Sequence, residues 1–416
     1  MKTPHVVIVG GGFGGLSAAK ALARGNKVKV TLIDKRNYHL FQPLLYQVAM
    51  AGLSPADIAY PLRALLSQHD SVEVLLGEVK DINKTEKWIQ TDTNKVLYDY
   101  LILACGSTYT YFGSPQWEQY APTLKTISQA TEIRRRVFLA FEKAERESDP
   151  DVQMMYMTFV IVGGGPTGVE LAGSLGEITR FSILRDFDHI SPNKAKIVLI
   201  EAGPTILPTM SPDLQREAKK QLEELGVDVR VNAKVSEINE KGIMAGGIFI
   251  SAGTVLWAAG VAASPLNKTL GAELDRQGRV VVNRDLSIPN HPEVFVIGDQ
   301  AHYEWGEDKK PLPGLAPVAM QQGRFVAKVI NKKISGKMPP EYFKYIDKGQ
   351  MATVGRSRAV AMYKGLEFSG FTAWMAWLLV HIYYLIGFKN RIFVLLQWAW
   401  TYLTFRRGAR LIIEKE

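Results

Sequence analysis

The feature that most limits the possible folds of this chain is a glycine-rich turn that occurs twice. Each copy directly follows a short run of β-branched residues. The first copy covers residues 6–15 and the second covers residues 159–168, so their starts lie 153 residues apart. A continuous apolar run that ends in glycine is typical of a buried parallel strand, and the residues after each turn have a helical pattern. The repeat therefore predicts an α/β chain with two open parallel sheets.

The first turn has the glycine spacing that a bound pyrophosphate requires. Glycine at positions 10, 12 and 15 allows a tight turn, a close approach of backbone to phosphate, and close packing of helix on strand. A second apolar run ends at Asp34, 24 residues after Gly10, where a carboxylate accepts ribose hydroxyls. The alternative is a glycine-rich turn between unrelated elements, but the order of strand, turn, helix, strand and acid favours a dinucleotide. The residues assigned to this site are Gly10, Gly12, Phe13, Gly14, Gly15, Asp34 and Lys35.

The second turn precedes a helix and is followed by an apolar run, 197–200, that ends at Glu201. Glu201 lies further along than the usual ~20 residues after the turn, so we expect an insertion near Arg180–Asn193. A carboxylate here would repel a 2′-phosphate about 5 Å away by roughly 3 kcal/mol at an effective dielectric of about 20. Residues 202–207 contain no Lys or Arg to compensate, so the site is expected to prefer NADH over NADPH. The residues assigned to it are Gly163, Gly165, Pro166, Thr167, Gly168, Glu170 and Glu201.

The composition excludes several kinds of chemistry. The 416 residues contain one cysteine, Cys105, so no internal disulfide, Cys-ligated zinc or iron–sulfur site, or cycling Cys pair is available. The seven histidines have no ligand spacing, and we expect no metal. No secretory signal is readable before the first strand, which favours a cytoplasmic location. The formal charge of +9 follows from 50 basic and 41 acidic residues. The positions of the basic residues along the chain decide whether this charge indicates a nucleic acid or an anionic membrane as partner.

Three further segments resemble the flavoproteins that carry two dinucleotide-binding domains. These segments are Leu101–Ser107, Val255–Gly260 and Val294–Asp299. The resemblance implies non-covalent FAD at the first site and NADH at the second. It places Ala104, Gly106 and Asp299 at the FAD, with Asp299 holding the ribityl chain, and Gly260 at the NADH.

Four segments resemble, more closely, the type II NADH:quinone oxidoreductases, which are single-subunit enzymes that pump no protons. They are Asn37–Ala49, Pro166–Gly173, Trp257–Gly260 and Ala316–Ala327. The resemblance implies hydride transfer from nicotinamide to flavin N5 and then two-electron reduction of a quinone, ubiquinone or menaquinone. It also implies that Phe41–Ala49, including Gln42, lies beside the isoalloxazine ring, although the run also fits a simple apolar loop.

The same family has a pattern Ala-Gln-x-Ala-x-Gln that contacts flavin and quinone. Here Pro317 replaces the first glutamine, while Ala319 and Gln321 match. This departure leaves the orientation of the quinone open. Glu170 matches a glutamate implicated in quinone reduction, and a partly desolvated carboxyl with a raised pKa is suited to supply protons. The alternative is a carboxylate in the first turn of a helix, stabilised by the helix dipole.

The C-terminal part of the sequence has the composition of a membrane interface. Between Phe368 and Ile413 there is no Asp or Glu. The segments Phe371–Phe388 and Ile392–Phe405, of 18 and 14 residues, are too short for comfortable spans and fit two helices that lie in one leaflet. A buried hairpin or a homodimer interface is the alternative. The cations are Lys389, Arg391, Arg406, Arg407 and Arg410, and the Trp residues are Trp374, Trp377, Trp398 and Trp400. No nucleic-acid motif accompanies these cations.

The prediction is therefore an α/β protein with two Rossmann-like domains and a C-terminal region with membrane-associated helices. The FAD domain is expected from residues 1–118 and 285–335, the NADH domain from 119–284, and the anchoring region from 336–416. We expect a homodimer bound peripherally to the cytoplasmic face of the membrane. The alternatives are a soluble NADH-dependent reductase of a protein acceptor and a non-catalytic redox-sensing flavoprotein.

Overall fold

The chain folds into two compact units in a computed structural model, which describes residues 3–25, 27–307, 309–405 and 407–412. One unit comprises Met1–Leu40, Ala59–Thr108 and Val261–Asp347. The other comprises Phe41–Ile58, Tyr109–Gly260 and Lys348–Glu416. We call them the first and the second unit. Each contains one of the two glycine-rich turns, while the expected boundaries of the cofactor domains stay a prediction.

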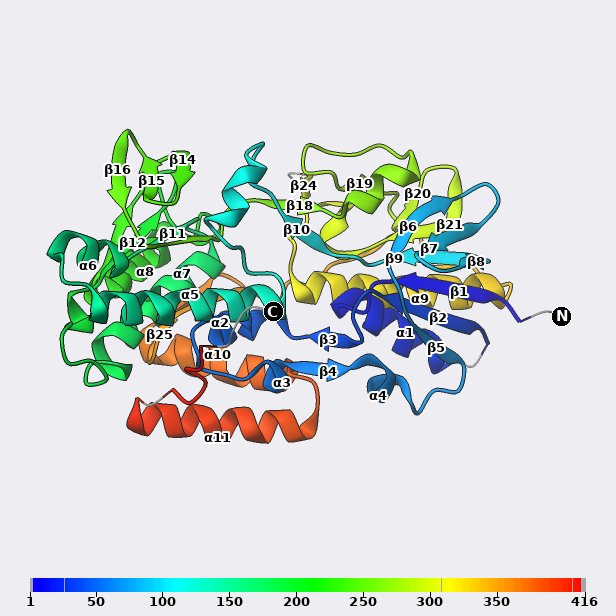
Figure 1. Ribbon diagram of the computed structural model, residues 1–416. Coiled ribbons are helices and arrows are strands. Elements are labelled where there is room, and N and C mark those ends of the chain that lie inside the picture. The colour runs from blue at the N-terminus through cyan, green and yellow to red at the C-terminus, as the bar shows by residue number, and fades with distance from the viewer. Residues whose placement is uncertain (1–2, 26, 308, 406, 413–416) are drawn as a thin grey trace. The chain divides into compact units, whose positions relative to one another are not determined.

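A six-stranded sheet of order β20-β21-β9-β1-β2-β5 forms the centre of the first unit. All its strands are parallel except the edge strand β20. Helices α1 and α9 pack against each other beside this sheet (Figure 1). Continuous runs of Val, Ile and Leu make strands that are buried on both faces, as a covered parallel sheet requires. The bounds are β1 His5–Val9, α1 Phe13–Ala23, β2 Lys29–Asp34, β5 Val72–Leu76, β9 Tyr100–Leu103, β20 Ser287–Ile288, β21 His291–Val296 and α9 Ala316–Ile334.

Short elements complete the first unit. They are β3 Tyr38–Leu40, β4 Ala59–Pro61, α4 Leu62–Leu66, β6 Val79–Asn83, β7 Trp88–Thr91, β8 Lys95–Leu97, β18 Val261–Ala263, η5 Pro265–Leu270, β19 Val280–Val281, η6 Gly298–Gln300, β22 Ala301–His302, β23 Glu304–Trp305 and β24 Lys310–Pro311. Strand β10, Ser107–Tyr109, lies where the chain passes to the second unit.

The second unit contains a parallel sheet of order β13-β12-β11-β17. Thr158 pairs with Lys196 as His5 pairs with Lys29, so both sheets begin with the same register of two adjacent strands. The bounds are α5 Ile127–Arg146, β11 Thr158–Val162, α7 Pro166–Glu177, β12 Lys196–Ile200, α8 Pro212–Glu224, β13 Val227–Arg230 and β17 Thr254–Trp257. The expected insertion is present: a π-helical turn, η3 Ile178–Ser182, an irregular loop and η4 Pro192–Lys194 separate α7 from β12.

The remaining elements of the second unit include two antiparallel sheets, β14-β15-β16 and β25-β26-β27, and the two C-terminal helices. They are η1 Gln42–Leu44, α2 Leu45–Ala49, α3 Pro55–Ile58, η2 Pro115–Gln119, α6 Pro150–Tyr156, β14 Val235–Asn239, β15 Gly242–Ala245, β16 Ile248–Ser251, β25 Gln350–Gly355, β26 Arg358–Tyr363, β27 Leu366–Ser369, α10 Gly370–Tyr384 and α11 Phe388–Thr404.

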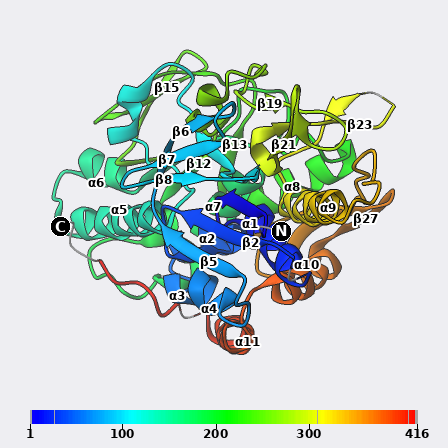
Figure 2. The same cartoon turned by 90° about the vertical axis from the view of Figure 1, so that its right-hand side faces the viewer.

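The two C-terminal helices lie next to each other, and Figure 2 shows α11 nearly end-on. The break between them is earlier than expected, because Gly387 has a φ of +90° and α11 already begins at Phe388. Arg391 therefore lies inside α11, and its guanidinium donates to the carbonyl oxygens of Leu385 (2.7 Å) and Tyr383 (2.9 Å), at the end of α10. Within the described residues, the structure has no helix with the length and apolar character needed to cross a membrane.

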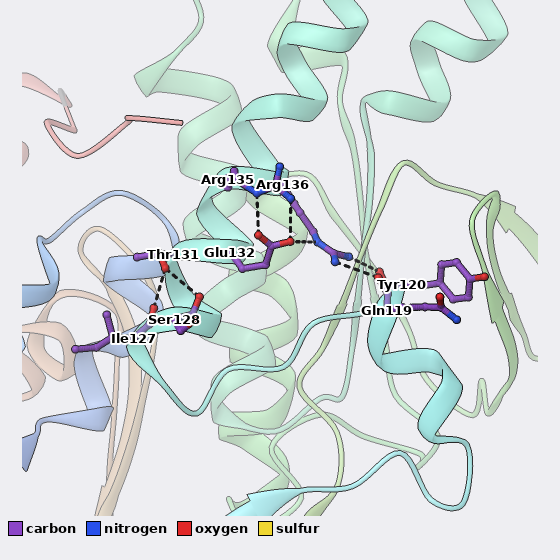
Figure 3. Close-up of polar contacts among 8 residues, drawn as sticks. All are labelled: Gln119, Tyr120, Ile127, Ser128, Thr131, Glu132, Arg135 and Arg136. Atoms are coloured by element: carbon purple, nitrogen blue, oxygen red, sulfur yellow. Dashed lines mark hydrogen bonds and ion pairs between the residues drawn. The ribbon is translucent and has the colours of Figure 1, made fainter. Parts of the chain in front are cut away.

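Helix α5 is tied to the preceding 3₁₀ turn through a carboxylate and two arginines (Figure 3). Glu132 accepts from Arg135 Nε at 2.8 Å and from Arg136 Nε at 2.7 Å. Arg136 also donates to the carbonyl oxygens of Tyr120 (2.9 Å) and Gln119 (3.0 Å). The hydrogen bond from Arg135, with that from Arg136, lowers the pKa of Glu132 to about 2. The network therefore depends on an ionised carboxylate.

Replacing Glu132 by Gln is expected to lower the free energy of unfolding by about 1 kcal/mol at pH 7. The pKa of Glu132 falls from 4.5 to about 2 on folding. The contribution of this carboxylate to the free energy of unfolding is therefore complete above pH 4.5 and is lost as the pH falls toward 2. Thermal unfolding of wild type and variant between pH 7 and pH 3 measures this. The difference in Tm should shrink with acidification, whereas Glu142→Gln, an exposed change on the same helix, should leave Tm unchanged. A pH-independent difference would contradict the assignment.

Candidate functional site

The two glycine-rich turns have the same local structure. Gly10 and Gly163 have φ values of +105° and +113°, which side-chain-bearing residues rarely adopt. Their amide groups donate to the carbonyl oxygens of Ile33 (2.8 Å) and Ile200 (2.7 Å), at the end of the neighbouring strand. Each turn therefore brings its helix N-terminus to the carboxyl edge of its own sheet, where open α/β sheets bind ligands.

The acid at the end of the second strand makes equivalent contacts in each unit. Asp34 accepts from the backbone N–H of Gly11 (2.6 Å) and of Arg36 (2.7 Å). Glu201 accepts from the backbone N–H of Gly164 (2.7 Å) and of Gly203 (2.7 Å). Each carboxylate oxygen thus holds one backbone donor and keeps lone pairs that can accept a ribose hydroxyl.

The N-termini of α1 and α7 fit a pyrophosphate. The N-cap residues are Gly12 and Gly165, and neither helix has a side-chain cap among the described contacts. A Cβ built at either glycine finds no atom within 4 Å, so the backbone faces open space there. Free N–H groups beside open space at a positive helix end bind anions. The residues present therefore fit one dinucleotide in each unit.

Asp299 lies in η6 of the first unit, where two side chains orient the turn. Ser107 Oγ donates to the Asp299 carboxylate at 2.8 Å. The amide oxygen of the buried Gln322 accepts from the backbone N–H of Gly298 at 2.7 Å. Ala319 packs against the same turn, since its Cβ would lie 3.3 Å from a Cβ built at Gly298. Gln322 was missed in the sequence because only Gln321 matches the family pattern.

Several predicted cofactor residues have other contacts in the structure. Lys35 lies 3.8 Å from Glu78 in an exposed ion pair. Gln42 donates to the carbonyl oxygen of Lys125 at 3.4 Å. Their roles at the FAD stay predictions.

Both ends of the side-chain amide of Gln321 bind the backbone of one residue. Its nitrogen donates to the carbonyl oxygen of Ile346 and its oxygen accepts from the Ile346 backbone N–H, both at 3.0 Å. Pro317 lies in the first turn of α9, where no intrahelical N–H bond is lost. The substitution at position 317 therefore suits the helix, and the quinone contact of Gln321 stays a prediction.

Glu170 is the fifth residue of α7, beyond the first turn, so the alternative based on the helix dipole is wrong in its placement. Its side chain is half-buried, and burial raises the pKa of the carboxyl well above its ordinary value. A hydrogen bond from the Thr353 backbone N–H opposes that rise in pKa. Close approach of α7 to β25 supplies this donor, because a Cβ at Gly173 would lie 1.6 Å from the carbonyl oxygen of Val354.

A buried charged cluster in the second unit was not anticipated. Arg407, expected at a lipid surface, is only 8% exposed and donates to Glu177 (2.8 Å) and to the Met50 carbonyl oxygen (2.8 Å). The phenol of Tyr46 is buried, and burial, followed by the charge of Glu170, raises its pKa well above the ordinary value. Sequence distance hid this cluster, since its members come from α2, α7 and the C-terminal tail.

The first unit has polar side chains inside it: His39 and Gln300 are buried, and Cys105 is partly buried. His39 Nδ1 bonds the Gly11 carbonyl oxygen at 3.0 Å, and burial lowers the pKa of His39 to about 4, so the ring is neutral. Its Nε2 has no hydrogen-bond partner among the described residues, and neither have the two amide atoms of Gln300. Burial also raises the pKa of Cys105 to about 12, which agrees with a packing role. The described residues contain no group of three or more His, Cys, Asp or Glu side chains that could hold a metal ion.

Comparison with known proteins gives consistent results. Residues 4–323 match the family model described as pyridine nucleotide-disulphide oxidoreductase. The type II NADH:quinone oxidoreductase Ndh of Mycobacterium tuberculosis is 43% identical over 99% of this chain and 91% of its own length. A type II NADH:quinone oxidoreductase of Staphylococcus haemolyticus is 30% identical over 88% of this chain and 91% of its own length. The structure of NDH2 from Plasmodium falciparum in complex with NADH superimposes with a TM-score of 0.88 at 23% identity, covering 99% of this chain and 100% of that one.

Replacing Glu201 by Ser is expected to reduce the preference for NADH over NADPH by about 10-fold or more, because the variant loses an acceptor for the ribose and a charge that repels the 2′-phosphate. Steady-state kcat/KM for both nucleotides measures this. Asp228→Ser, which removes an exposed carboxylate of the same sheet, is the control and should keep the wild-type ratio. An unchanged ratio in the Glu201 variant would contradict the assignment.

Proposed function

We propose that this chain, which belongs to the type II NADH:quinone oxidoreductases, oxidises NADH and reduces a quinone by two electrons without pumping protons. The observation that carries the proposal is the pair of equivalent dinucleotide cradles, one in each unit, in a chain with a single cysteine. Without a cysteine pair, electrons must pass directly from a flavin to the acceptor, which is a quinone in this proposal and a protein in the rival one.

The first unit would hold FAD and the second would hold NADH. The FAD pyrophosphate fits the turn before α1, its ribose fits Asp34, and its ribityl chain fits Asp299. When bound, FAD accepts hydride at N5 from the nicotinamide and supplies two electrons to the quinone. The Gly163–Gly168 turn and Glu201 bind the nucleotide and orient it, which converts the transfer into a positioned reaction.

Glu170 would supply protons to the quinone. Quinone reduction takes up two protons together with two electrons, and the raised pKa of Glu170 lets its carboxyl hold a proton to higher pH than an ordinary glutamate. Gln321 would orient the quinone, and Pro317 removes one polar contact that the family pattern would offer. The choice between quinones would depend on this contact, which Pro317 removes.

Helices α10 and α11 would bind the membrane surface. On α11 the apolar residues Phe393, Leu396, Trp400 and Leu403 are 53–77% exposed, and their spacing of three and four residues puts them on one helix face. The cations contribute less than expected: Arg407 and Arg410 form ion pairs with Glu177 and Asp186, and Arg391 binds carbonyl oxygens. Lys389 is exposed, and Arg406 lies outside the described residues. Apolar burial rather than charge would therefore dominate.

The rest of the proposal concerns assembly and location. We place a homodimer peripherally on the cytoplasmic face of the membrane, with the FAD domain, NADH domain and anchoring region at the boundaries expected from the sequence. The rival functions make different predictions. A soluble reductase of a protein acceptor would stay in the supernatant without detergent, and a redox sensor would show negligible turnover with NADH and a short-chain quinone.

Replacing Glu170 by Gln is expected to lower kcat for a short-chain quinone by about 100-fold, while NADH oxidation by ferricyanide, which takes up no protons, stays at the wild-type rate. The wild-type quinone rate should fall as the pH rises through the raised pKa of Glu170, and the variant should lack this phase. Glu223→Gln, at an exposed position on α8, is the control. Unchanged quinone turnover of the Glu170 variant at every pH would remove Glu170 from the mechanism, and a colourless purified protein would refute the proposed function.

Replacing both Leu396 and Leu403 by Glu is expected to prevent co-sedimentation with lipid vesicles, because each buried leucine stabilises binding by about 2 kcal/mol. Vesicles with and without phosphatidylglycerol, at low and high salt, separate apolar from electrostatic binding. The matched control, Leu97→Glu with Ile248→Glu, changes leucine and isoleucine side chains of comparable exposure (66% and 61%). If the control also loses binding, or the wild type does not bind, the assignment of α11 fails.

A further inference from the structure

The carbonyl oxygen of the middle glycine in the first turn is held by a side chain. His39 Nδ1 lies 3.0 Å from the oxygen of Gly11. A carbonyl oxygen only accepts, so Nδ1 must carry the hydrogen of this bond. His39 is only 2% exposed, and burial lowers its pKa to about 4, so the ring is neutral at physiological pH. The neutral ring therefore has its hydrogen on Nδ1 and a lone pair on Nε2.

The second unit binds the equivalent carbonyl oxygen with a different group. Gly164 lies 153 residues after Gly11 and has the same place in the second turn. The backbone N–H of Leu207 donates to the Gly164 oxygen at 2.7 Å. His39 and Leu207 follow the acid of their own turn by five and six residues. Each unit therefore places a donor against the same carbonyl oxygen, from the segment just after the acid, although one donor is a side chain and the other is backbone.

The middle glycine of each turn is thus held at both of its backbone groups. Its N–H donates to the acid, at 2.6 Å from Gly11 to Asp34 and at 2.7 Å from Gly164 to Glu201. Its carbonyl oxygen accepts from the two donors described above. The agreement between the two units indicates that the turn itself requires both contacts, and that the imidazole bond is more than the packing of one ring.

A fixed carbonyl oxygen also fixes the N–H of the next residue. The peptide bond is planar, and the described residues contain no cis peptide bond, so the oxygen of Gly11 and the N–H of Gly12 point in opposite directions. Gly12 is the N-cap of α1 and has no side-chain cap. A Cβ built there meets no atom within 4 Å. The hydrogen bond from His39 therefore holds the direction of an N–H in the open cradle where the pyrophosphate is expected.

Stability alone does not explain an imidazole at this position. Its Nε2 is buried and has no hydrogen-bond partner among the described residues. A buried acceptor without a donor costs free energy, and an apolar side chain would avoid that cost. The ring of His39 also packs at right angles to that of Phe13, the first residue of α1, with ring centroids 5.0 Å apart. Both contacts of the ring therefore lie at the glycine-rich turn and the start of its helix.

We propose that His39 is a positioning residue of the FAD site, and that it orients the peptide between Gly11 and Gly12 so that the N–H of this peptide meets the pyrophosphate. This inference deepens the proposed function and rests on FAD binding in the first unit. In the second unit the backbone N–H of Leu207 has the same role for NADH, and a change of side chain does not remove it. A substitution of His39 should therefore weaken the binding of FAD and leave that of NADH unchanged.

The test compares His39→Leu and His39→Asn in the full-length holoenzyme. Leucine has no donor, so the dissociation constant of FAD, measured by flavin fluorescence on dilution, should rise about 10-fold. Asparagine places its Nδ2 close to the position of the histidine Nδ1, and should keep this constant within about threefold of the wild-type value. The two ³¹P resonances of bound FAD report on the pyrophosphate itself. They should move in His39→Leu and stay at their wild-type positions in His39→Asn.

Two controls separate this role from general damage. His5→Leu removes an imidazole whose Nε2 lies 2.8 Å from Thr31 Oγ1, at the other end of β1 from the turn. This variant should keep the wild-type dissociation constant and ³¹P resonances. The KM for NADH should be the same in every variant, because the second turn has its own donor. A KM for NADH that rises as much as the dissociation constant of FAD would overturn the inference.

A second measurement uses the wild-type protein, so it holds even where His39→Leu does not fold. In holoenzyme labelled with ¹⁵N-histidine, the ring signals of His39 are assigned by their loss in His39→Asn. They should show a hydrogen on Nδ1 and none on Nε2 between pH 8 and pH 6, since the pKa of the ring is about 4. An Nδ1 without hydrogen, an unchanged FAD dissociation constant in His39→Leu, or an equal loss of affinity in His39→Asn would overturn the inference. A purified wild-type protein without FAD would instead refute the proposed function.

Discussion

Close contact between a helix and the turn before it is the constraint on which the rest of this structure depends. A Cβ at Gly15 would lie 1.8 Å from the carbonyl oxygen of Gly10, and a Cβ at Gly168 would lie 1.8 Å from that of Gly163. No side chain fits at either position, so glycine is required for the helix to start where it does. The consequence is an uncapped helix N-terminus at the carboxyl edge of a parallel sheet, which is the element that binds a pyrophosphate.

Helix α7 takes part in three features of the second unit: the glycine-rich turn, the contact with β25 and the ion pair with Arg407. Its N-terminus follows the second glycine-rich turn, and its middle approaches β25 so closely at Gly173 that the Thr353 backbone N–H reaches Glu170. Its last residue, Glu177, forms the buried ion pair with Arg407. A buried pair of this kind costs desolvation and gives weak evidence of net stability, but removing one partner leaves an unpaired buried charge. Arg407 is therefore held against α7.

The charges of the C-terminal region show what a composition argument leaves out. Basic and aromatic residues without acids are typical of a membrane interface, and the exposed apolar face of α11 supports that interpretation. Yet Arg407 and Arg410 find their counter-ions, Glu177 and Asp186, in distant parts of the sequence. Local sequence contains no acid for them, so the pairing could not be foreseen. The positive charge available to bind anionic lipid is therefore smaller than the number of basic residues in this region indicates.

The sequence by itself determined the two dinucleotide cradles and their acids, because each is a local arrangement of strand, glycine turn and helix whose spacing is set by backbone geometry. Asp34 and Glu201 could be named from position alone, and the structure gives them equivalent backbone contacts. The surroundings of Glu170 depended on the tertiary structure. Its helix position was misjudged by one turn, and its neighbours Tyr46 and Thr353 lie more than a hundred residues away along the chain. Desolvation and hydrogen bonding act through space, so only packing could show which carboxyl is raised in pKa.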